Sequence, residues 1–345
     1  MFFVPSPYTP PALPDRLHRS ARLEDRMHYL VEKLLRRRGW RPRVVPYIGY
    51  GTDGWVRVLA RVLLAPPGTP RREIERGRGW RRFFCATATG VPVSVDLGGC
   101  VHTAVSGRGG YVDEVIDADL APGWATAQLT VESGASIEAF FRVVSPQARL
   151  GVISDIDDTV VVTAMPRPML AVWNTMLLPE TSRRPVPGMA AMYESLLGSD
   201  PDSFLVYLST GAWNVAPALS NFLTRHGFPR GPMLMTDWGP TADAWFRSGR
   251  AHKRQQLLRL MSELPQLTWV FVGDDGQHDP DLYAEAVSAF PGRVRAVAIR
   301  QLTAAQQVLT HGTPEPLPEK TPGPNVPEVR APDGFELLTL LTPHL

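Results

Sequence analysis

The stretch GVISDIDDTV, residues 151–160, decides how the second half of the chain is interpreted. It begins as a short apolar run and ends in Asp155, Asp157 and Asp158, followed by Thr159. A short run that is apolar on both faces is typical of a strand buried in a parallel sheet. Because charged groups are costly to bury alone, a buried strand that ends in carboxylates indicates that a polar partner meets them there.

The segments that follow this stretch repeat the same pattern. Short apolar runs alternate with helical segments such as 216–226 and 281–290, and the runs are 150–153, 204–208, 233–235, 269–272 and 294–299. Strands that are apolar on both faces and separated by helices form a parallel sheet covered on both sides. We therefore expect a doubly wound α/β domain over residues 147–345.

In the residues that precede this domain, apolar residues recur at every second position, which is the spacing of a strand. In VPVSVDL, residues 91–97, Val91, Val93, Val95 and Leu97 alternate with polar residues or proline. Similar short runs separated by glycine-rich turns predict seven or eight antiparallel strands over residues 41–146. This pattern indicates an all-β sandwich or a small barrel, of which we expect the sandwich, and nothing in it suggests catalysis.

Residues 1–40 are predicted to contain a basic amphipathic helix, with apolar residues at helical spacing between Leu23 and Leu34. Residues 1–150 carry 21 basic and 14 acidic side chains, whereas residues 151–345 carry 15 and 20. Two interpretations of the helix stay open. It packs on the neighbouring domain with a solvated arginine face, or it attaches the chain peripherally to an anionic membrane surface.

Composition limits the class of protein. The chain has 345 residues, of which 44% are hydrophobic, and it contains neither a run long enough to span a membrane nor a secretion signal. We therefore expect a cytoplasmic protein, with contact at the inner membrane surface as the alternative. Cys85 and Cys100 are too few for a disulfide framework, and we expect both to be buried free thiols.

Polar residues stand where successive predicted strands end. The first strand ends at Asp155, the second at Ser209-Thr210-Gly211, and the strand 269–272 is followed by acidic residues from Asp274 to Asp279. Lys253 opens a helix between the last two strands. Ligands of open α/β sheets bind at the carboxyl ends of the strands, so we expect these side chains to share one site. Converging carboxylates require a cation, and Mg²⁺ is the cation that prefers hard oxygen ligands.

These residue types together suit phosphoryl transfer. In this interpretation Asp155 attacks phosphorus to give an aspartyl-phosphate, and Asp157 protonates the leaving oxygen and then activates water. Ser209 and the amide of Thr210 hold a phosphoryl oxygen. Lys253 balances the negative charge on the nucleophile and on the phosphate, a role for which its compact ammonium group is suited.

The four elements resemble the motifs of the haloacid dehalogenase superfamily of phosphatases. DxDxT, a strand-ending serine, a helix-opening lysine and GD followed by D occur in this order, 54, 44 and 21 residues apart. Within that superfamily, DIDDT, YLS followed by Trp213, HK and GDDGQHDP resemble the catalytic domain of the actin-patch type of phosphatidate phosphatase. The resemblance implies Mg²⁺-dependent removal of phosphate from phosphatidate.

The resemblance also implies roles for single residues. Asp155, the main-chain oxygen of Asp157, and Asp274 would bind the metal. Ser209 and Lys253 would bind the phosphate, and Thr159 would support the loop. Asp279 would support the site as a carboxylate that does not bind the metal itself, and Asp275 is a rival for the ligand role.

Two further segments belong to the predicted catalytic domain. An insert at 161–187 carries apolar residues flanked by arginines, and it either receives an acyl chain and an anionic head group or is a buried connection. Residues 313–332 are rich in proline, and 335–341 are expected to dock back as a last helix. The expected ligand is a phosphomonoester, most simply a lipid, and no nucleic acid partner is expected. A phosphatase for a soluble phosphomonoester and a lipid-binding scaffold with little turnover are the alternatives.

Overall fold

The fold is described from a computed structural model of the chain. It describes residues 19–68, 86–134, 136–162, 184–198, 200–236, 249–276, 278–311, 313–314, 323 and 325–345. The described residues divide into two compact units, one ending at Pro146 and one beginning at Gln147.

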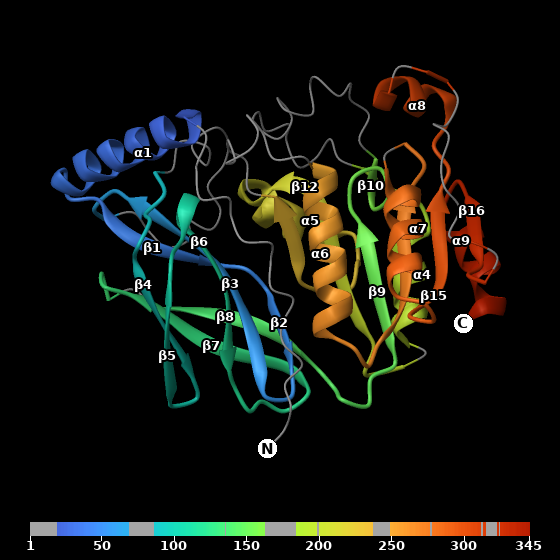
Figure 1. Cartoon of the computed structure of the whole chain (residues 1–345), viewed down its shortest axis with the longest axis horizontal. Helices are drawn as coiled ribbons and strands as arrows, with labels where there is room; N and C mark the ends of the chain where they lie inside the picture. Colours follow the sequence, from blue (N-terminus) through green and yellow to red (C-terminus); the bar gives the residue numbers. More distant parts are fainter. Residues whose placement is uncertain are drawn as a thin grey trace. The chain divides into compact units, whose positions relative to one another are not determined.

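The second unit is built on a parallel sheet of six strands in the order β13-β12-β9-β14-β15-β16 (Figure 1). The strands are β9 (Leu150–Asp155), β12 (Phe204–Ala212), β13 (Met233–Thr236), β14 (Thr268–Asp274), β15 (Val294–Arg300) and β16 (Glu328–Ala331). Every residue of β9 is buried, as expected for a strand covered on both faces. The prediction of a parallel sheet in an α/β domain is confirmed.

Helices cover this sheet. They are α4 (Met189–Gly198), α5 (Ala216–Arg225), α6 (Gly249–Glu263), α7 (Asp279–Ala289), α8 (Ala304–His311) and α9 (Gly334–Leu341). Figure 1 shows α6 and α7 in front of the sheet, where they contact each other, and α4 behind it. On its own side α4 contacts α9, the predicted last helix, which Asp333 caps by accepting hydrogen bonds from the amides of Phe335 and Glu336. The helices on both faces confirm the doubly wound arrangement.

The strand order reverses direction at β9. After β9 the chain adds β12 and then β13 on one side, and it returns to the other side of β9 for β14, β15 and β16. The carboxyl end of β9 therefore lies at a topological switch point, where ligands of open α/β sheets bind.

The ends of the predicted insert meet at this part of the sheet. β10 (Val161–Val162) and β11 (Arg184–Pro185) pair as a two-stranded antiparallel ribbon. The chain therefore leaves and returns at one place. Residues 163–183, to which the acyl-binding prediction refers, lie outside the described residues, as do 315–322 of the proline-rich segment.

The first unit contains eight strands in one continuous sheet of order β1-β3-β2-β8-β7-β4-β5, with β6 also paired to β3. The strands are β1 (Arg41–Pro46), β2 (Gly49–Thr52), β3 (Trp55–Ala65), β4 (Pro92–Leu97), β5 (Cys100–Val105), β6 (Tyr111–Asp117), β7 (Gly123–Val131) and β8 (Ser136–Val144). The outermost strands β5 and β6 contact each other, so the sheet curls around its own apolar core. Two separate sheets packed as a sandwich are not confirmed, and β2 pairs with β8 in parallel rather than antiparallel.

The alternating pattern of β4 has the predicted effect. Val93, Val95 and Leu97 point into the core of the first unit, while the residues between them are half-buried. The prediction for Cys100 is wrong, because this free thiol is exposed at the first position of the outer strand β5. Cys85 lies outside the described residues.

The predicted amphipathic helix is α1 (Arg19–Arg37), which precedes β1. Its last turn is followed by Trp40, which packs with Leu35 against the core of the first unit. In the part of the chain that the structure describes, no helix combines the length and the apolar composition needed to cross a bilayer.

Gly151 tests the packing of β9. An added Cβ at this position would lie 2.5 Å from Cε3 of Trp269, whose ring is fully buried. Because the neighbouring strand holds this ring in place, Gly151→Ala is expected to lower the free energy of unfolding by about 1–3 kcal/mol, measured by urea denaturation. The matched control is Gly198→Ala, where a Cβ meets nothing within 4 Å, and its expected effect is within about 0.5 kcal/mol. Equal effects of the two substitutions would contradict the tight contact between β9 and Trp269.

Candidate active site

Three neighbouring strands of the parallel sheet carry polar residues at the same level, near their carboxyl ends, and β12 continues three residues beyond its polar residue, Ser209, to Ala212. Asp155, the last residue of β9, is paired with Leu208 of β12, which directly precedes Ser209. On the other side of β9, the paired strand β14 ends at Asp274. The pairing of these strands therefore brings Asp155, Ser209 and Asp274 to one edge of the sheet.

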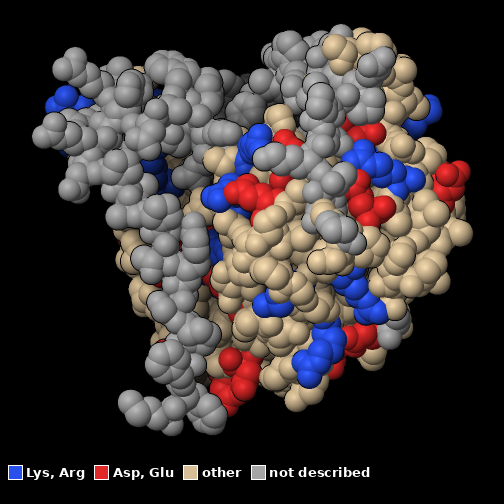
Figure 2. Space-filling view, turned by 45° about the vertical axis from the view of Figure 1, so that its right-hand side comes forward, with Lys and Arg blue, Asp and Glu red and all other residues tan. Residues whose placement is uncertain are grey.

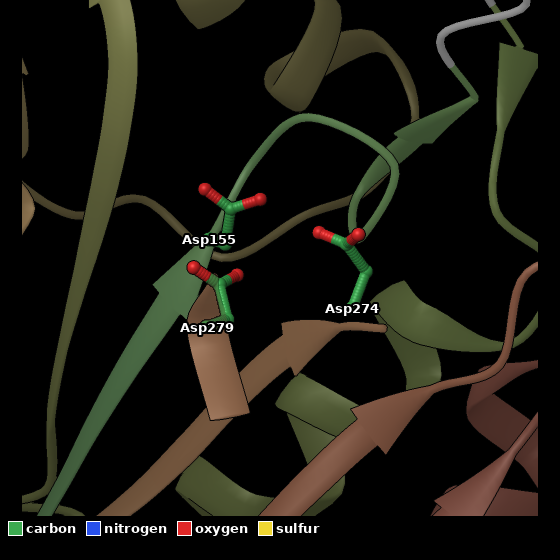
Figure 3. Close-up of side chains that lie close together, drawn as sticks. All are labelled: Asp155, Asp274 and Asp279. Atoms are coloured by element: carbon green, nitrogen blue, oxygen red, sulfur yellow. The ribbon is translucent and has the colours of Figure 1, made fainter. Parts of the chain in front are cut away.

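Three carboxylates form a buried cluster at this edge. Figure 3 shows the side chains of Asp155 and Asp274 reaching from the ends of their strands, with that of Asp279 at the start of α7 beside them. One carboxylate oxygen from each residue lies within 4.8 Å of the others, and all three residues are buried. Asp279 also occupies the first turn of a helix, where the helix dipole favours negative charge.

A buried lysine joins two of these carboxylates. Nζ of Lys253, on α6, lies 2.6 Å from Oδ1 of Asp155 and donates a hydrogen bond of 2.7 Å to Oδ1 of Asp279. Burial alone would lower the pKa of Lys253, but the charges of Asp155 and Asp279 outweigh it and raise this pKa. The raised pKa favours the ammonium form of Lys253, which contacts two of the three carboxylates in the cluster.

The excess of negative charge affects the pKa values of the acids in the cluster. Burial raises the pKa of Asp155 well above its ordinary value, and the nearby charges of Asp279 and Asp157 raise it further, against the opposing effect of Lys253. Burial also raises the pKa of Asp274, with Asp279 and Asp155 adding to the shift. These carboxylates are therefore costly to ionise without a further cation.

The oxygens of the cluster fit a divalent metal ion. Oδ2 of Asp155, Asp274 and Asp279 is buried and has no hydrogen-bond partner among the described residues. Buried polar atoms normally have partners, so three unpaired oxygens in one place are suited to bind a cation. Carboxylate oxygens are the donors that Mg²⁺ selects, and the donor set therefore fits this ion.

Asp157 differs from the three buried acids because it is half-buried. Its Oδ2 accepts a hydrogen bond of 3.1 Å from Oγ of Ser209, and this Oγ accepts one of 2.9 Å from the amide of Gly211. An added Cβ at Gly211 would lie 3.1 Å from the same Oγ, so glycine leaves room for this serine. Asp157 and Ser209 thus form the more accessible part of the site.

Thr210 helps to position α6. An added Cβ at Gly249, the first residue of this helix, would lie 2.8 Å from Cγ2 of Thr210, so only glycine permits the close approach of the two elements. The approach fixes the start of α6 beside the end of β12, four residues before Lys253.

Thr159, the predicted supporting residue, is completely buried, and its Oγ1 has no hydrogen-bond partner among the described residues.

Arg300 holds the turn that follows Asp157. Asp158 has a left-handed backbone with φ of 56°, which is strained for a residue other than glycine. Nη1 of Arg300, at the end of β15, donates a hydrogen bond of 2.5 Å to the carbonyl oxygen of Asp158, and its Nε donates one of 3.1 Å to that of Pro332. The guanidinium therefore ties the strained turn to the end of β16. Asp158 itself is buried.

Asp275 is not a member of the cluster. Its Oδ1 accepts hydrogen bonds of 2.9 Å from the amide of Leu302 and 2.7 Å from Nε2 of Gln307. Burial raises the pKa of this acid. Since Asp279 and not Asp275 joins Asp155 and Asp274, the rival ligand suggested by the sequence is the less suitable of the two.

Two contacts of the site were not predicted. The Arg300 guanidinium is one, although a charged residue that ends the apolar strand 294–299 is a signal of the kind used for Asp155. The other is a buried pair in which Oγ of Ser154 lies 2.6 Å from the Tyr193 hydroxyl on α4. Oγ of Ser154 also donates to the carbonyl oxygen of Asp155 at 2.6 Å, so this pair steadies the backbone of the acid.

Comparison with known proteins gives an independent view of this site. Residues 150–301 match the family model described as phosphatidate phosphatase APP1, catalytic domain. An uncharacterized protein of Schizosaccharomyces pombe is 27% identical over 154 residues, which are 44% of this chain and 25% of that protein. Phosphatidate phosphatase APP1 of Saccharomyces cerevisiae is 25% identical over 159 residues, 46% of this chain and 26% of that protein.

The matches have a limited extent. The chain spans about a quarter of the length of the curated relatives that it matches. Among solved structures, the match to the HAD domain of the effector protein Lem4 from Legionella pneumophila covers 45% of this chain and 87% of that domain's chain. It is 14% identical with a TM-score of 0.33, which by itself does not indicate a common fold.

The buried carboxylates predict how stability depends on pH and on metal. Folding raises the pKa of Asp155 and Asp274, so the folded state favours their protonated forms. Their contribution to the free energy of unfolding is therefore complete below the ordinary carboxyl pKa, and it is lost as the pH rises through the raised pKa values. In chelator, Asp274→Asn should therefore gain thermal stability relative to the wild type as the pH rises from about 5 to about 8. Mg²⁺ should raise the melting temperature of the wild type at the higher pH and that of the variant much less.

Differential scanning fluorimetry measures both effects, with Asp281→Asn as the control. Asp281 lies on α7 two residues after Asp279, but it pairs with Arg250 at 3.7 Å and is outside the cluster. The control should follow the wild type at every pH. An equal response of Asp274→Asn and the wild type to Mg²⁺ would contradict a metal site in this cluster.

Proposed function

We propose that this chain is a divalent-metal-dependent phosphomonoester hydrolase, because residues 150–301 match the family model of the phosphatidate phosphatase APP1 catalytic domain and a yeast relative carries that name. One observation carries the proposal. Three buried carboxylates share one ammonium at the switch point of the sheet, next to the more accessible Asp157. A dianionic phosphate ester with a metal ion suits such a site better than a neutral ligand does.

Asp155 is the proposed nucleophile. Its carboxylate oxygen forms a bond to phosphorus while the bond between phosphorus and the ester oxygen breaks, which leaves an aspartyl-phosphate. The leaving oxygen takes the proton of the Asp157 carboxyl group and departs as an alcohol. The hydrogen bond of 3.1 Å between Ser209 and Asp157 places this acid beside the serine that would bind the phosphate, within reach of the leaving oxygen.

Asp157 acts again in the second half of the reaction. Its carboxylate takes a proton from water, and the water oxygen bonds to phosphorus while the bond to the Asp155 oxygen breaks. This step releases inorganic phosphate, and it restores the Asp155 carboxylate and the protonated Asp157. The half-buried position of Asp157 suits a group that meets both the ester and water, whereas Asp155 is enclosed.

Other residues bind and orient. Asp155, Asp274 and the main-chain oxygen of Asp157 would hold Mg²⁺, and the position of Asp279 beside them makes it a further candidate. The ion would neutralise charge on the phosphate oxygens. Lys253 keeps the nucleophile oriented through its ion pair, while Ser209 and the amide of Thr210 are the proposed donors to a phosphoryl oxygen.

We propose a lipid phosphomonoester, in the class of phosphatidate, as the substrate. The support is the name of the Saccharomyces cerevisiae relative, which is a phosphatidate phosphatase. The proposed place of action is the cytoplasmic side of a membrane, where such a substrate is found. A soluble phosphomonoester is the second candidate, because the described residues of the site recognise only the phosphate group.

Loss of single acids tests the chemistry. Release of phosphate from dioctanoyl phosphatidate should require Mg²⁺ and fall to background in Asp155→Asn, which removes the nucleophile. Asp157→Asn should lower kcat by about 10²–10⁴-fold, because it removes the general acid and base. Asp281→Asn, the control on α7, should keep wild-type turnover. Turnover by Asp155→Asn, or wild-type turnover in chelator, would contradict this mechanism.

A substrate panel separates the candidate functions. The panel contains short-chain phosphatidate, lysophosphatidate, a sugar phosphate and a nucleoside monophosphate, each measured as kcat/KM with Mg²⁺. A lipid phosphatase should prefer the first two by more than about tenfold, since added apolar contact is worth roughly 1–3 kcal/mol. Preference for a soluble ester would support the second candidate. Binding of lipid vesicles with no turnover of any ester would support a scaffold instead.

A further inference from the structure

The helix α1 presents an apolar face to solvent. Met27, Leu30, Val31 and Leu34 are 58%, 62%, 44% and 49% exposed. Their spacing of three, four and seven residues places all four on one side of the helix. A helix that only covered its own domain would turn this side inward.

A different side of α1 holds the helix to the first unit. Leu35 packs against the apolar core of that unit. Arg36 donates hydrogen bonds of 2.9 Å to both Glu32 and Glu132, and Glu32 accepts a weaker bond of 3.4 Å from the amide of Thr89. The helix is thus fixed through Glu32, Leu35 and Arg36, and its apolar face stays outside.

Basic residues border this exposed face. Residues 19–38 contain seven basic and three acidic side chains, a net charge of +4. With 3.6 residues per turn, the exposed Arg26, Lys33 and Arg37 lie along one border of the apolar face. By contrast, Lys and Arg side chains lie beside Asp and Glu side chains on the face shown in Figure 2. Positive charge and apolar surface therefore coincide on α1.

We propose that α1 docks the chain on the surface of an anionic lipid bilayer. The apolar face defined by Met27, Leu30, Val31 and Leu34 enters the boundary between head groups and acyl chains. Arg26, Lys33 and Arg37 then lie at the level of the anionic head groups. This docking is carried by α1 alone and does not depend on the proposed phosphatase activity, although it would bring the chain to a surface that holds lipid phosphate esters.

Charge favours a bilayer over a second copy of this chain. Pairing two copies of α1 through their apolar faces would bring together two copies of residues 19–38, each with a net charge of +4, and like charges repel. Glu32, the acidic residue of the described side chains of α1, is already engaged by Arg36. An anionic bilayer supplies the opposite charge along the whole border.

Vesicle flotation with the full chain in chelator tests the proposal. The vesicles contain phosphatidylcholine with about one third phosphatidylserine, a composition with a negative surface potential and no phosphomonoester for the active site. The wild type should bind these vesicles, bind pure phosphatidylcholine vesicles at least tenfold more weakly, and lose affinity as salt is raised. Leu30→Gln/Leu34→Gln should bind at least tenfold more weakly, because glutamine keeps helix propensity but removes the apolar face.

The matched control is Val101→Thr/Val105→Thr, which removes two exposed apolar side chains from β5 in the same unit. This variant should bind like the wild type. If the chain is a phosphatase, neither double variant should change hydrolysis of the soluble ester p-nitrophenyl phosphate. The test of vesicle binding is therefore independent of the test of phosphatase activity. Equal binding by Leu30→Gln/Leu34→Gln and the wild type would overturn the proposal. Concentration-dependent dimers in sedimentation velocity that disappear in this variant would also overturn it, in favour of a second copy.

Discussion

The structure of the second unit depends on the burial of three carboxylates beside one ammonium. Asp155, Asp274 and Asp279 converge at a point where solvent cannot screen them, and Lys253 contacts the first and the third. Such a cluster is destabilising on its own, because each ionised carboxylate raises the cost of the next. The cluster is compatible with a divalent cation, for which the unpaired Oδ2 atoms of the three acids are suitable donors.

The surrounding elements are adapted to hold this cluster. A Cβ added at Gly273 would lie 2.7 Å from Oδ2 of Asp279, so glycine lets the start of α7 approach the end of β14. The left-handed turn at Asp158 is held by Arg300, which also binds the segment after β16. The C-terminal strand therefore contributes to the site although it carries none of the acids.

Much of the site follows from the sequence because parallel strands impose their own geometry. Strands that are apolar on both faces are expected inside a parallel sheet, and the residues near their carboxyl ends meet at one edge. This geometry alone predicts that Asp155, Ser209 and Asp274 lie together. The sequence also predicts that Lys253 and Asp279 lie at this edge, but it does not predict how deeply they are buried. The position of Asp279 inside the cluster depends on how closely α7 approaches β14, which strand pattern does not encode.

Other features depend on contacts between distant segments. The pairing of Arg300 with Asp158 joins residues that are 142 positions apart, and no local pattern selects that partner. In the first unit, alternation correctly predicted which residues of β4 point inward. Alternation is the same in a sandwich and in one curled sheet, so it did not reveal that β5 and β6 meet at the ends of a continuous sheet.

Anomalous diffraction from crystals soaked with Mn²⁺, which replaces Mg²⁺ at oxygen sites, would locate a cation bound by these carboxylates. One strong peak is expected at the carboxyl end of β9, within coordination distance of Asp155 and Asp274. In Asp274→Asn crystals this peak should be lost or greatly weakened. An ion bound elsewhere with the cluster empty, or a peak unchanged in the variant, would contradict the claim that these buried carboxylates form a metal site.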